Sequence, residues 1–141
     1  AVDPAEIVAE STGGGKIIHK FTIKNVLPGT YDLVVTKDAH LKYTIKNVVV
    51  GDTPLDLMTH ANAAISTMTL LAGDIDSDGW IDFADSQELL KSTNYGKQTS
   101  TAGVNKITDL DGDTWVDFSD YQILLSSQHY GKSAVSVGFA A

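Results

Sequence analysis

The twelve residues Asp74–Asp85 read DIDSDGWIDFAD, and the pattern returns as DLDGDTWVDFSD over Asp109–Asp120. An acid stands at positions 1, 3, 5, 9 and 12 of both stretches: Asp74, Asp76, Asp78, Asp82 and Asp85 in the first, and Asp109, Asp111, Asp113, Asp117 and Asp120 in the second. Five carboxylates within twelve residues repel one another, and a nearby cation reverses that effect. Calcium needs 6–8 oxygen ligands at about 2.3–2.6 Å, which alternate acids in a tight loop can supply.

Each stretch has the spacing of a calcium-binding loop, with a ligand expected at every acid and a further one at position 7. Position 7 is Trp80 or Trp115, which would offer its backbone carbonyl. Position 9 usually acts through a water molecule. Two acidic surface turns without any metal are the alternative interpretation. Because two complete patterns stand in register, we predict two bound Ca²⁺ ions.

The charge of the chain follows from these loops. The 141 residues carry a formal net charge of −8, and ten of the eighteen acids lie in the two loops. Such an acid excess argues against nucleic acid or an anionic membrane surface as a partner. No apolar run reaches transmembrane length, so no direct membrane insertion is expected. There is no cysteine, which excludes disulfides. The abundance of extracellular calcium favours a secreted setting.

The loops belong to a longer duplication. Residues 74–97 and 109–132 align without gaps at an offset of 35, and 14 of these 24 positions are identical. About ten helix-compatible residues follow each loop, and each copy ends in Tyr-Gly-Lys. An ordinary EF-hand also has a helix before its loop. Here the first loop follows an apolar segment and the second a polar, glycine-broken one. The predicted unit is therefore a loop and then a helix, present twice.

The first half of the chain alternates apolar and polar residues, as β-strands do. Strands are predicted around Phe21–Ile23, Tyr31–Val35 and Tyr43–Val50, with turn residues between them. The segment 61–71 is ambiguous, because its alanines permit a helix while residues 65–70 fit a last strand better. Short strands separated by turns favour a small antiparallel β-sandwich.

Two parts of the sequence resemble known families. The segments GDIDSDGWIDFADSQELL and TDLDGDTWVDFSDYQILL resemble the dockerin family, which consists of paired calcium loop–helix repeats on cellulosomal proteins. This likeness covers residues 72–132. The segment FTIKNVLPGTYDLVVTKDAHLKYTIKNVVV resembles Ig-like modules of the collagen-adhesin B and carboxypeptidase regulatory type. An Ig-like module directly before a dockerin is similar to the X module–dockerin pair of a cellulosomal scaffoldin.

The resemblance implies two modules: an N-terminal all-β Ig-like sandwich, the X module, over residues 1–71, and an α-helical dockerin with two calcium-binding loop–helix (F-hand) repeats over residues 72–141. It implies a calcium-dependent adaptor rather than an enzyme. The dockerin would bind a cohesin module of another protein to assemble or anchor a cellulosome-type complex for polysaccharide degradation, with the X module supporting the contact. The implied setting is extracellular, either secreted or held at a bacterial cell surface through the cohesin.

Two loop positions depart from the ordinary EF-hand. Position 12 is Asp85 or Asp120 instead of a bidentate Glu. Position 6, where the loop turns sharply, is Gly79 in the first copy but Thr114 in the second. If that turn needs a positive φ, a β-branched Thr there is strained by roughly 1–2 kcal/mol. The second site is therefore predicted to bind calcium more weakly than the first.

The repeats divide into a predicted core and a predicted partner-binding face. Residues that are apolar in both copies are expected between the helices: Ile81, Val116, Leu89, Leu124, Leu90 and Leu125. Loop positions 10 and 11 and the helix residues on the same side are expected to contact the cohesin: Phe83, Ala84, Gln87, Glu88 and Lys91 in copy one, and Phe118, Ser119, Gln122, Ile123 and Ser126 in copy two. The alternative is that Phe83 and Phe118 belong to the core. Because Ile123 and Ser126 are uncharged where copy one has Glu88 and Lys91, the second helix is expected to dominate binding.

Other functions fit the sequence less well. Calcium sensors are rich in methionine and have paired-helix EF-hands, whereas this chain has two methionines and lacks the entering helices. No nucleophile–base pair, glycine-rich phosphate loop or open transition-metal site is visible, so an enzyme is not expected. A calcium-stabilised structural module with a carbohydrate-binding or calcium-sensing role is the alternative to the adaptor.

Overall fold

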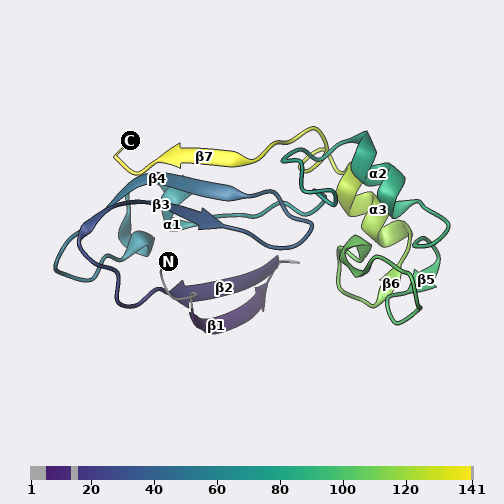
Figure 1. The fold of residues 1–141 in the computed structure, drawn as a ribbon, viewed down its shortest axis with the longest axis horizontal. Helices are drawn as coiled ribbons and strands as arrows, with labels where there is room; N and C mark the ends of the chain where they lie inside the picture. Colours follow the sequence, from purple (N-terminus) through teal and green to yellow (C-terminus); the bar gives the residue numbers. More distant parts are fainter. Residues whose placement is uncertain (1–5, 14–15, 141) are drawn as a thin grey trace.

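The computed structural model of the chain describes residues 6–13 and 16–140. Residues 1–5, 14–15 and 141, which the two predicted modules include, lie outside the described residues. The elements in chain order are β1 (Glu6–Gly13), β2 (Lys16–Thr22), β3 (Gly29–Val35), β4 (Tyr43–Val50), η1 (Leu57–Thr59), α1 (Ala63–Ser66), α2 (Phe83–Leu89), β5 (Lys97–Gln98), η2 (Lys106–Thr108), β6 (Trp115–Val116), α3 (Phe118–Leu125) and β7 (Val135–Gly138). The larger strands lie at one end of an elongated molecule, and α2 and α3 lie at the other (Figure 1).

The described strands form three small sheets. β1 and β2 pair antiparallel with each other. β3, β4 and β7 form a mixed sheet, in which β3 runs antiparallel to β4 and β7 runs parallel to it, from Tyr43 opposite Val135 to Lys46 opposite Gly138. β5 and β6 form a short antiparallel pair between the two repeats. The strand that completes the largest sheet therefore comes from beyond the second repeat.

The predicted fold class, an antiparallel Ig-like sandwich followed by a separate α-helical module, is wrong. The described part of residues 1–71 forms no closed antiparallel sandwich, because its sheets are separate and the larger one is completed in parallel by β7. The helical end is not self-contained either. Ala39 and Leu41, from the connection between β3 and β4, are buried in the same core as α2 and α3. The chain is a mixed β and α fold in which each end includes residues from the other half of the sequence: β7 in the sheet, and Ala39 and Leu41 in the core of the helical end.

The segment after β4 corrects a second expectation. The segment 61–71 was ambiguous, with a strand the better fit over residues 65–70, but the chain forms the short helix α1 at the alanines and then an irregular segment. The Asn62 side chain caps α1 by accepting from Ala64 N at 3.0 Å, and the Tyr43 hydroxyl donates to Ala64 O at 2.6 Å. Ile65 is thereby buried against β4, so the apolar residues of this segment serve as the layer beneath the sheet.

α2 and α3 begin at corresponding residues of the two acid loops because each loop ends in a capping box. The Asp82 side chain accepts from Ala84 N at 2.8 Å, and the Asp85 side chain accepts from Asp82 N at 2.8 Å. Asp117 and Asp120 repeat this arrangement at α3. No helix in the described part of the chain is long and apolar enough to cross a membrane.

The core of the helical end confirms part of the predicted packing. Ile81, Val116, Leu89 and Leu124 are fully buried. Leu90 and Leu125 were expected beside them, but they are exposed by 43% and 44%. Successive helix residues point about 100° apart, so two adjacent leucines cannot both face the neighbouring helix. The second leucine of each pair lies on the outer surface.

The repeats are joined by their ends. We name residues 96–99 and 131–134 the tails of the first and second repeat. Each tail runs along the acid loop of the other repeat, not along its own. The backbone hydrogen bonds run from Gly96 N to Val116 O (2.7 Å), Thr99 N to Thr114 O (2.9 Å), Gly131 N to Ile81 O (2.8 Å) and Ala134 N to Gly79 O (2.8 Å). The bonds of Gly96 and Thr99 correspond, at the offset of 35 residues, to those of Gly131 and Ala134. Each tail therefore contacts the loop of the other repeat in the same way.

Candidate metal loops and partner-binding face

Each acid loop gathers carboxylates around one point. In loop one (residues 74–85), Asp74, Asp76 and Asp78 each offer an oxygen, and these oxygens lie within 4.8 Å of one another. In loop two (residues 109–120), the same holds for Asp109, Asp111 and Asp120. Carboxylate oxygens are the ligands that hard divalent cations such as calcium prefer. Both clusters could therefore hold a metal ion.

The acids at position 12, Asp85 and Asp120, lie inside their loops and are fully buried. Asp85 accepts from the backbone N–H groups of Ile75 at 2.7 Å, Asp76 at 3.2 Å and Asp82 at 2.8 Å. Asp120 accepts from the corresponding groups at 2.6, 3.2 and 2.8 Å. Position 12 thus ties the start of each loop to the first turn of its helix.

The remaining predicted acidic ligands line the same loops and hold the backbone in shape. Asp82 and Asp117 cap the helices. Asp113 accepts from Trp115 N at 2.8 Å, as Asp78 does from Trp80 N. An ionised carboxylate has about four lone-pair sites, so one such hydrogen bond leaves acceptor capacity for a cation.

Four carboxyl groups of the loops have a raised pKa, so their ionisation is unfavourable. Burial raises the pKa of Asp85 and of Asp120, even though backbone N–H groups oppose the effect. Burial also raises the pKa of Asp74, and the negative charge of Asp85 adds to it. Burial likewise raises the pKa of Asp111. Desolvated carboxyl groups that repel one another are stabilised in their ionised form by a cation, so the donor set fits a divalent ion.

These pKa shifts predict opposite effects of pH with and without calcium. In the calcium-free protein, a raised carboxyl pKa means that the folded state binds more protons than the unfolded state between the ordinary and the raised pKa. Its stability is then highest at the acidic side of this window and falls as pH rises through the raised pKa values. With calcium, protons compete for the ligands, so stability should rise over the same pH range.

Thermal unfolding followed by circular dichroism between pH 4.5 and 7, in calcium and in chelator, measures both slopes. The expected result is a midpoint that increases with pH in calcium and decreases with pH in chelator. Slopes of the same sign under both conditions would contradict the prediction.

The turn at position 6 has a positive φ in both loops: Gly79 has φ +91° and Thr114 has φ +79°. The N–H of each residue donates to the acid at position 1, with Gly79 3.2 Å from Asp74 Oδ2 and Thr114 3.0 Å from Asp109 Oδ2. Loop two therefore makes the same turn with a β-branched residue, for which this region costs roughly 1–2 kcal/mol.

Thr114→Gly is expected to tighten calcium binding at loop two by about fivefold, since relief of about 1 kcal/mol changes a binding constant by that factor. Gly79→Thr should weaken loop one by a similar factor. A Cβ at Gly79 would meet only Ala134 Cβ, at 3.9 Å, so that variant tests backbone strain and not a clash. A two-site calorimetric titration measures both. Equal or reversed affinities in the unmodified protein would contradict the predicted order.

The predicted partner-binding residues lie on the outer surface of the two helices. Phe83 and Phe118 are exposed by 65% and 58%, so the alternative that they belong to the core is wrong. Of the other residues, Ala84, Gln87, Lys91, Ser119 and Gln122 are exposed, and Glu88, Ile123 and Ser126 are half-buried. Leu90 and Leu125 lie seven residues after the phenylalanines, on the same side of the helix. Each helix thus presents a phenylalanine and a leucine to solvent.

The two helix faces differ at one position in particular. In copy one, Glu88 contacts the Lys91 ammonium, and its Oε1 lies within hydrogen-bond distance of Asn94 and Asn105. The hydrogen bond from Lys91 is the main cause that lowers the pKa of Glu88. In copy two the corresponding residue is Ile123. A partner that covers copy one must desolvate an ion pair, whereas copy two offers an aliphatic side chain.

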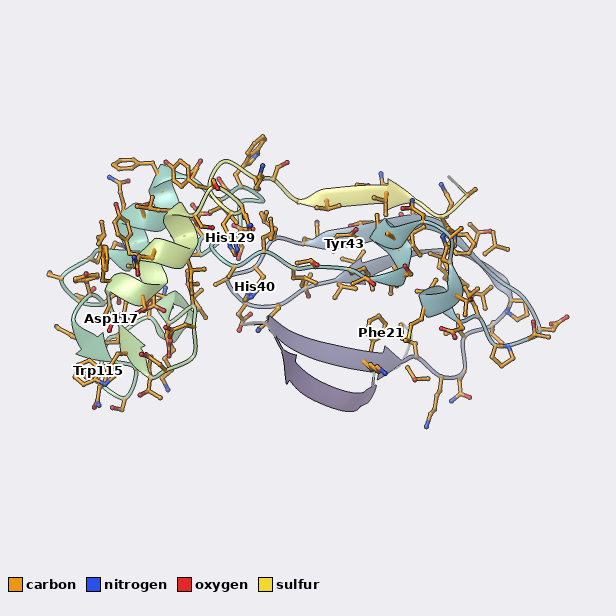
Figure 2. All side chains as sticks on the ribbon, turned by 180° about the vertical axis from the view of Figure 1, so that it is seen from behind. Phe21, His40, Tyr43, Trp115, Asp117 and His129 are labelled. Carbon is orange, nitrogen blue, oxygen red and sulfur yellow. The ribbon has the colours of Figure 1, made fainter. Side chains whose placement is uncertain are left out.

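The two tryptophans at position 7 have different surroundings. Trp80 lines a cleft of about 500 Å³ together with Lys37, His40, Lys42 and Ser133, between loop one and the β3–β4 connection. Trp115, in β6, is exposed by 44% and lies at the end of the molecule away from the β1–β2 and β3–β4–β7 sheets (Figure 2). Of the two rings, only that of Trp80 is near the β-sheet end.

Two corresponding residues that the sequence analysis missed, Asn94 and His129, fix the entrances of the loops. The buried Asn94 accepts from Asn105 N at 2.9 Å, near the start of loop two. His129 Nδ1 donates to Ala72 O at 2.7 Å, near the start of loop one. His129 lies close to His40 at the junction of the two ends of the molecule (Figure 2). Because Asn and His differ between the copies, the alignment of the repeats gives no signal for this shared role.

Comparison with known proteins gives matches among solved structures. No family model and no curated protein matches the chain. A structure of a type II cohesin–X–dockerin complex from Acetivibrio cellulolyticus, a C-terminal interface mutant, matches with 27% identity and a TM-score of 0.59. An N-terminal interface mutant of such a complex, from the same organism, matches with 26% identity and a TM-score of 0.57. Both matches cover 92% of this chain and 81% of the other chain.

These likenesses and the two acid loops indicate a class of protein. The chain is similar to components of cohesin–X–dockerin complexes, which supports a cellulosomal module that acts through protein–protein interaction. Both matches are to cohesin–X–dockerin complexes, which agrees with the prediction that the chain is not an enzyme. Its two carboxylate clusters could hold metal ions.

Proposed function

We propose that the chain is a calcium-dependent adaptor that takes the dockerin side of a cohesin–dockerin contact. Its repeats would bind one Ca²⁺ in each loop, through the twelve predicted ligands, and present α2 and α3 to a cohesin module. The β-sheet end would support that contact as the X module does in an X module–dockerin pair. The boundary between the proposed binding part and the proposed supporting part lies near residue 72. The acid loops, α2 and α3 follow it, and the supporting strands mainly precede it.

The observation that carries the proposal is the repeated coupling of a cation-suited loop to an exposed helix face. In both copies, position 12 of the loop is also the third residue of the helix, where its carboxylate completes the capping box. Phe83 and Phe118 then stand at the first residue of each helix, exposed to solvent. A cation that orders the loop therefore also orders the residues of the proposed binding face.

The similarity to cohesin–X–dockerin complexes supports the choice of a cohesin as partner. The composition of the face agrees with a protein partner, since exposed aromatic and aliphatic residues surrounded by polar ones are typical of interface hot spots. A cohesin contact would be made outside the cell, by a protein that is secreted or held at a bacterial surface through the cohesin.

Calorimetric binding to a panel of cohesins, first in calcium and then in excess chelator, tests the proposal. The expected result is tight binding to at least one cohesin that disappears with chelator. Calcium binding without any cohesin binding would overturn the adaptor function and leave a calcium-stabilised structural module. Equal binding to a cohesin in chelator would overturn the dependence on calcium.

A further inference from the structure

The C-terminal residues 131–139, which we name the strap, contact both ends of the molecule. Residues 131–134 lie along loop one. Gly131 N donates to Ile81 O and Ala134 N donates to Gly79 O, both at 2.8 Å, and Ile81 N donates back to Lys132 O at 2.9 Å. Three hydrogen bonds thus fix positions 6 to 8 of the loop from outside.

The peptide groups that the strap holds are those that orient the loop carboxylates. Gly79 accepts from the strap through its carbonyl, while its N–H donates to Asp74 Oδ2 at 3.2 Å. Trp80 pairs with Ser133 across the strap, while its N–H donates to Asp78 Oδ1 at 2.8 Å. Asp74 and Asp78 belong to the carboxylate cluster of loop one. Asp78 is therefore linked to the strap through the single peptide group between Gly79 and Trp80, and Asp74 through the backbone of Gly79.

The second part of the strap belongs to the β-sheet end. Val135 N donates to Lys42 O at 3.0 Å, and Phe139 N donates to Lys46 O at 2.9 Å. The side chains of Val135, Val137 and Phe139 pack against the core beneath β4. His60 Nε2 donates to Phe139 O at 2.9 Å. In Figure 1 the strap runs from the helical end to β4, where β7 pairs with residues 43–46, the first half of that strand.

The strap's hydrogen bonds to loop one and to β4 are made by consecutive residues. Ala134 N is bonded to loop one and the next backbone N–H, that of Val135, is bonded to β4. Neighbouring Cα atoms are 3.80 Å apart, so loop one cannot open its outer edge without pulling on the first residue of β7. We propose that the strap couples calcium binding in loop one to the pairing of β7 with β4, so that a filled loop fixes the helical end to the sheet. This inference rests on the proposed calcium binding.

Loop two supplies an internal comparison. The first tail binds loop two with the same hydrogen-bond pattern, from Gly96 and Thr99. It then continues into residues 100–108, where Val104 is buried in the core of the helical end. The first tail therefore returns to its own end of the molecule. Loop two borders a cleft that Lys37 and His40 of the β3–β4 connection also line, but in the described part of the chain it lacks the direct connection into a strand that loop one has.

The test uses this duplication as its control. The variant Asp74→Asn with Asp78→Asn disables loop one, and Asp109→Asn with Asp113→Asn disables loop two. Backbone hydrogen exchange is measured at Val135, Val137 and Phe139 in excess calcium, and calorimetry on the same samples counts the bound ions. We expect protection of these three amides to fall at least about tenfold in the first variant and less than about twofold in the second, within the usual range of coupling between sites.

The converse experiment keeps both loops intact. Val135→Pro removes the hydrogen bond to Lys42 O and should weaken calcium binding at loop one by about tenfold, because coupling is reciprocal, while loop two is unchanged. Ser136→Pro is the matched control, since alternate residues of a strand direct their N–H groups to opposite sides; it should leave both affinities unchanged.

Equal losses of β7 protection in the two loop variants, or calcium affinities that do not respond to Val135→Pro, would overturn the coupling while calcium binding stands. If the unmodified protein binds no calcium by calorimetry, the proposed function fails first and the coupling fails with it. The ion count separates these two outcomes.

Discussion

Chelation of calcium is expected to lower the thermal midpoint of the protein by roughly 15–20 °C. A ligand present at about 100 times its dissociation constant stabilises a folded protein by about 2.7 kcal/mol per site. Two sites give about 5 kcal/mol, which is comparable with the whole stability of many domains. The chain has 141 residues, and for that size the unfolding entropy converts about 5 kcal/mol into this shift. The raised carboxyl pKa values point the same way, since the loops oppose their own ionised form without a cation.

The measurement is a calorimetric scan in millimolar calcium and again in chelator. The variants that disable one loop each serve as controls, and each should lose about half of the effect. A midpoint that is unchanged by chelator would show that the carboxylate clusters hold no stabilising ion.

Phe118→Ala is expected to weaken cohesin binding by about 50-fold, whereas Phe83→Ala should weaken it less than about fivefold. Removal of a large aromatic side chain from the centre of an interface typically costs about 2–3 kcal/mol. The two phenylalanines have similar exposure, 58% and 65%, so a difference between them would come from their neighbours. On the same helix as Phe118 lies the half-buried Ile123, whereas the helix of Phe83 carries at that position Glu88, which is engaged with Lys91.

Ile123→Glu gives copy two the charge of copy one and should weaken binding as strongly as Phe118→Ala. Its matched partner is Glu88→Ile. The near-symmetry of the repeats also permits a pose rotated by about half a turn, with α2 in front, and in that case Glu88→Ile should restore binding to the Ile123→Glu variant. If Phe118→Ala and Ile123→Glu leave the affinity unchanged while Phe83→Ala abolishes it, the assignment to the second helix is wrong.

The repeats were predictable from the sequence because their signals are local. A carboxylate on alternate residues and an Asp three residues before another Asp at a helix start specify a loop and a cap without reference to the rest of the chain. The buried residues Leu89 and Leu124 follow from helical periodicity. The exposure of Leu90 and Leu125 was not predictable in this way. Two adjacent apolar residues look alike in sequence, and only the packing of the helix decides which one is buried.

The rest of the fold depends on pairings between distant residues. Nothing in residues 135–138 indicates a partner strand some 90 residues earlier. The parallel pairing of β7 with β4 depends on where in space the second repeat ends. The apolar residues 65–70 have the composition of a strand, but packing of Ile65 beneath β4 takes precedence over local preference. Ala39 and Leu41 lie in a connection that reads as a surface turn, yet they fill the core of the other end.

The crossed tails have a consequence for the origin of the repeats. Each tail lies on the loop of the other copy, with Gly96 on Val116 and Gly131 on Ile81, which is the relation between subunits of a domain-swapped dimer. A single ancestral repeat of this geometry would leave one loop edge uncovered and one tail unpaired. It would find both partners only in a second copy of itself. The duplication thus has the form of a symmetric dimer joined into one chain, and the symmetry ends where the second tail continues into β7.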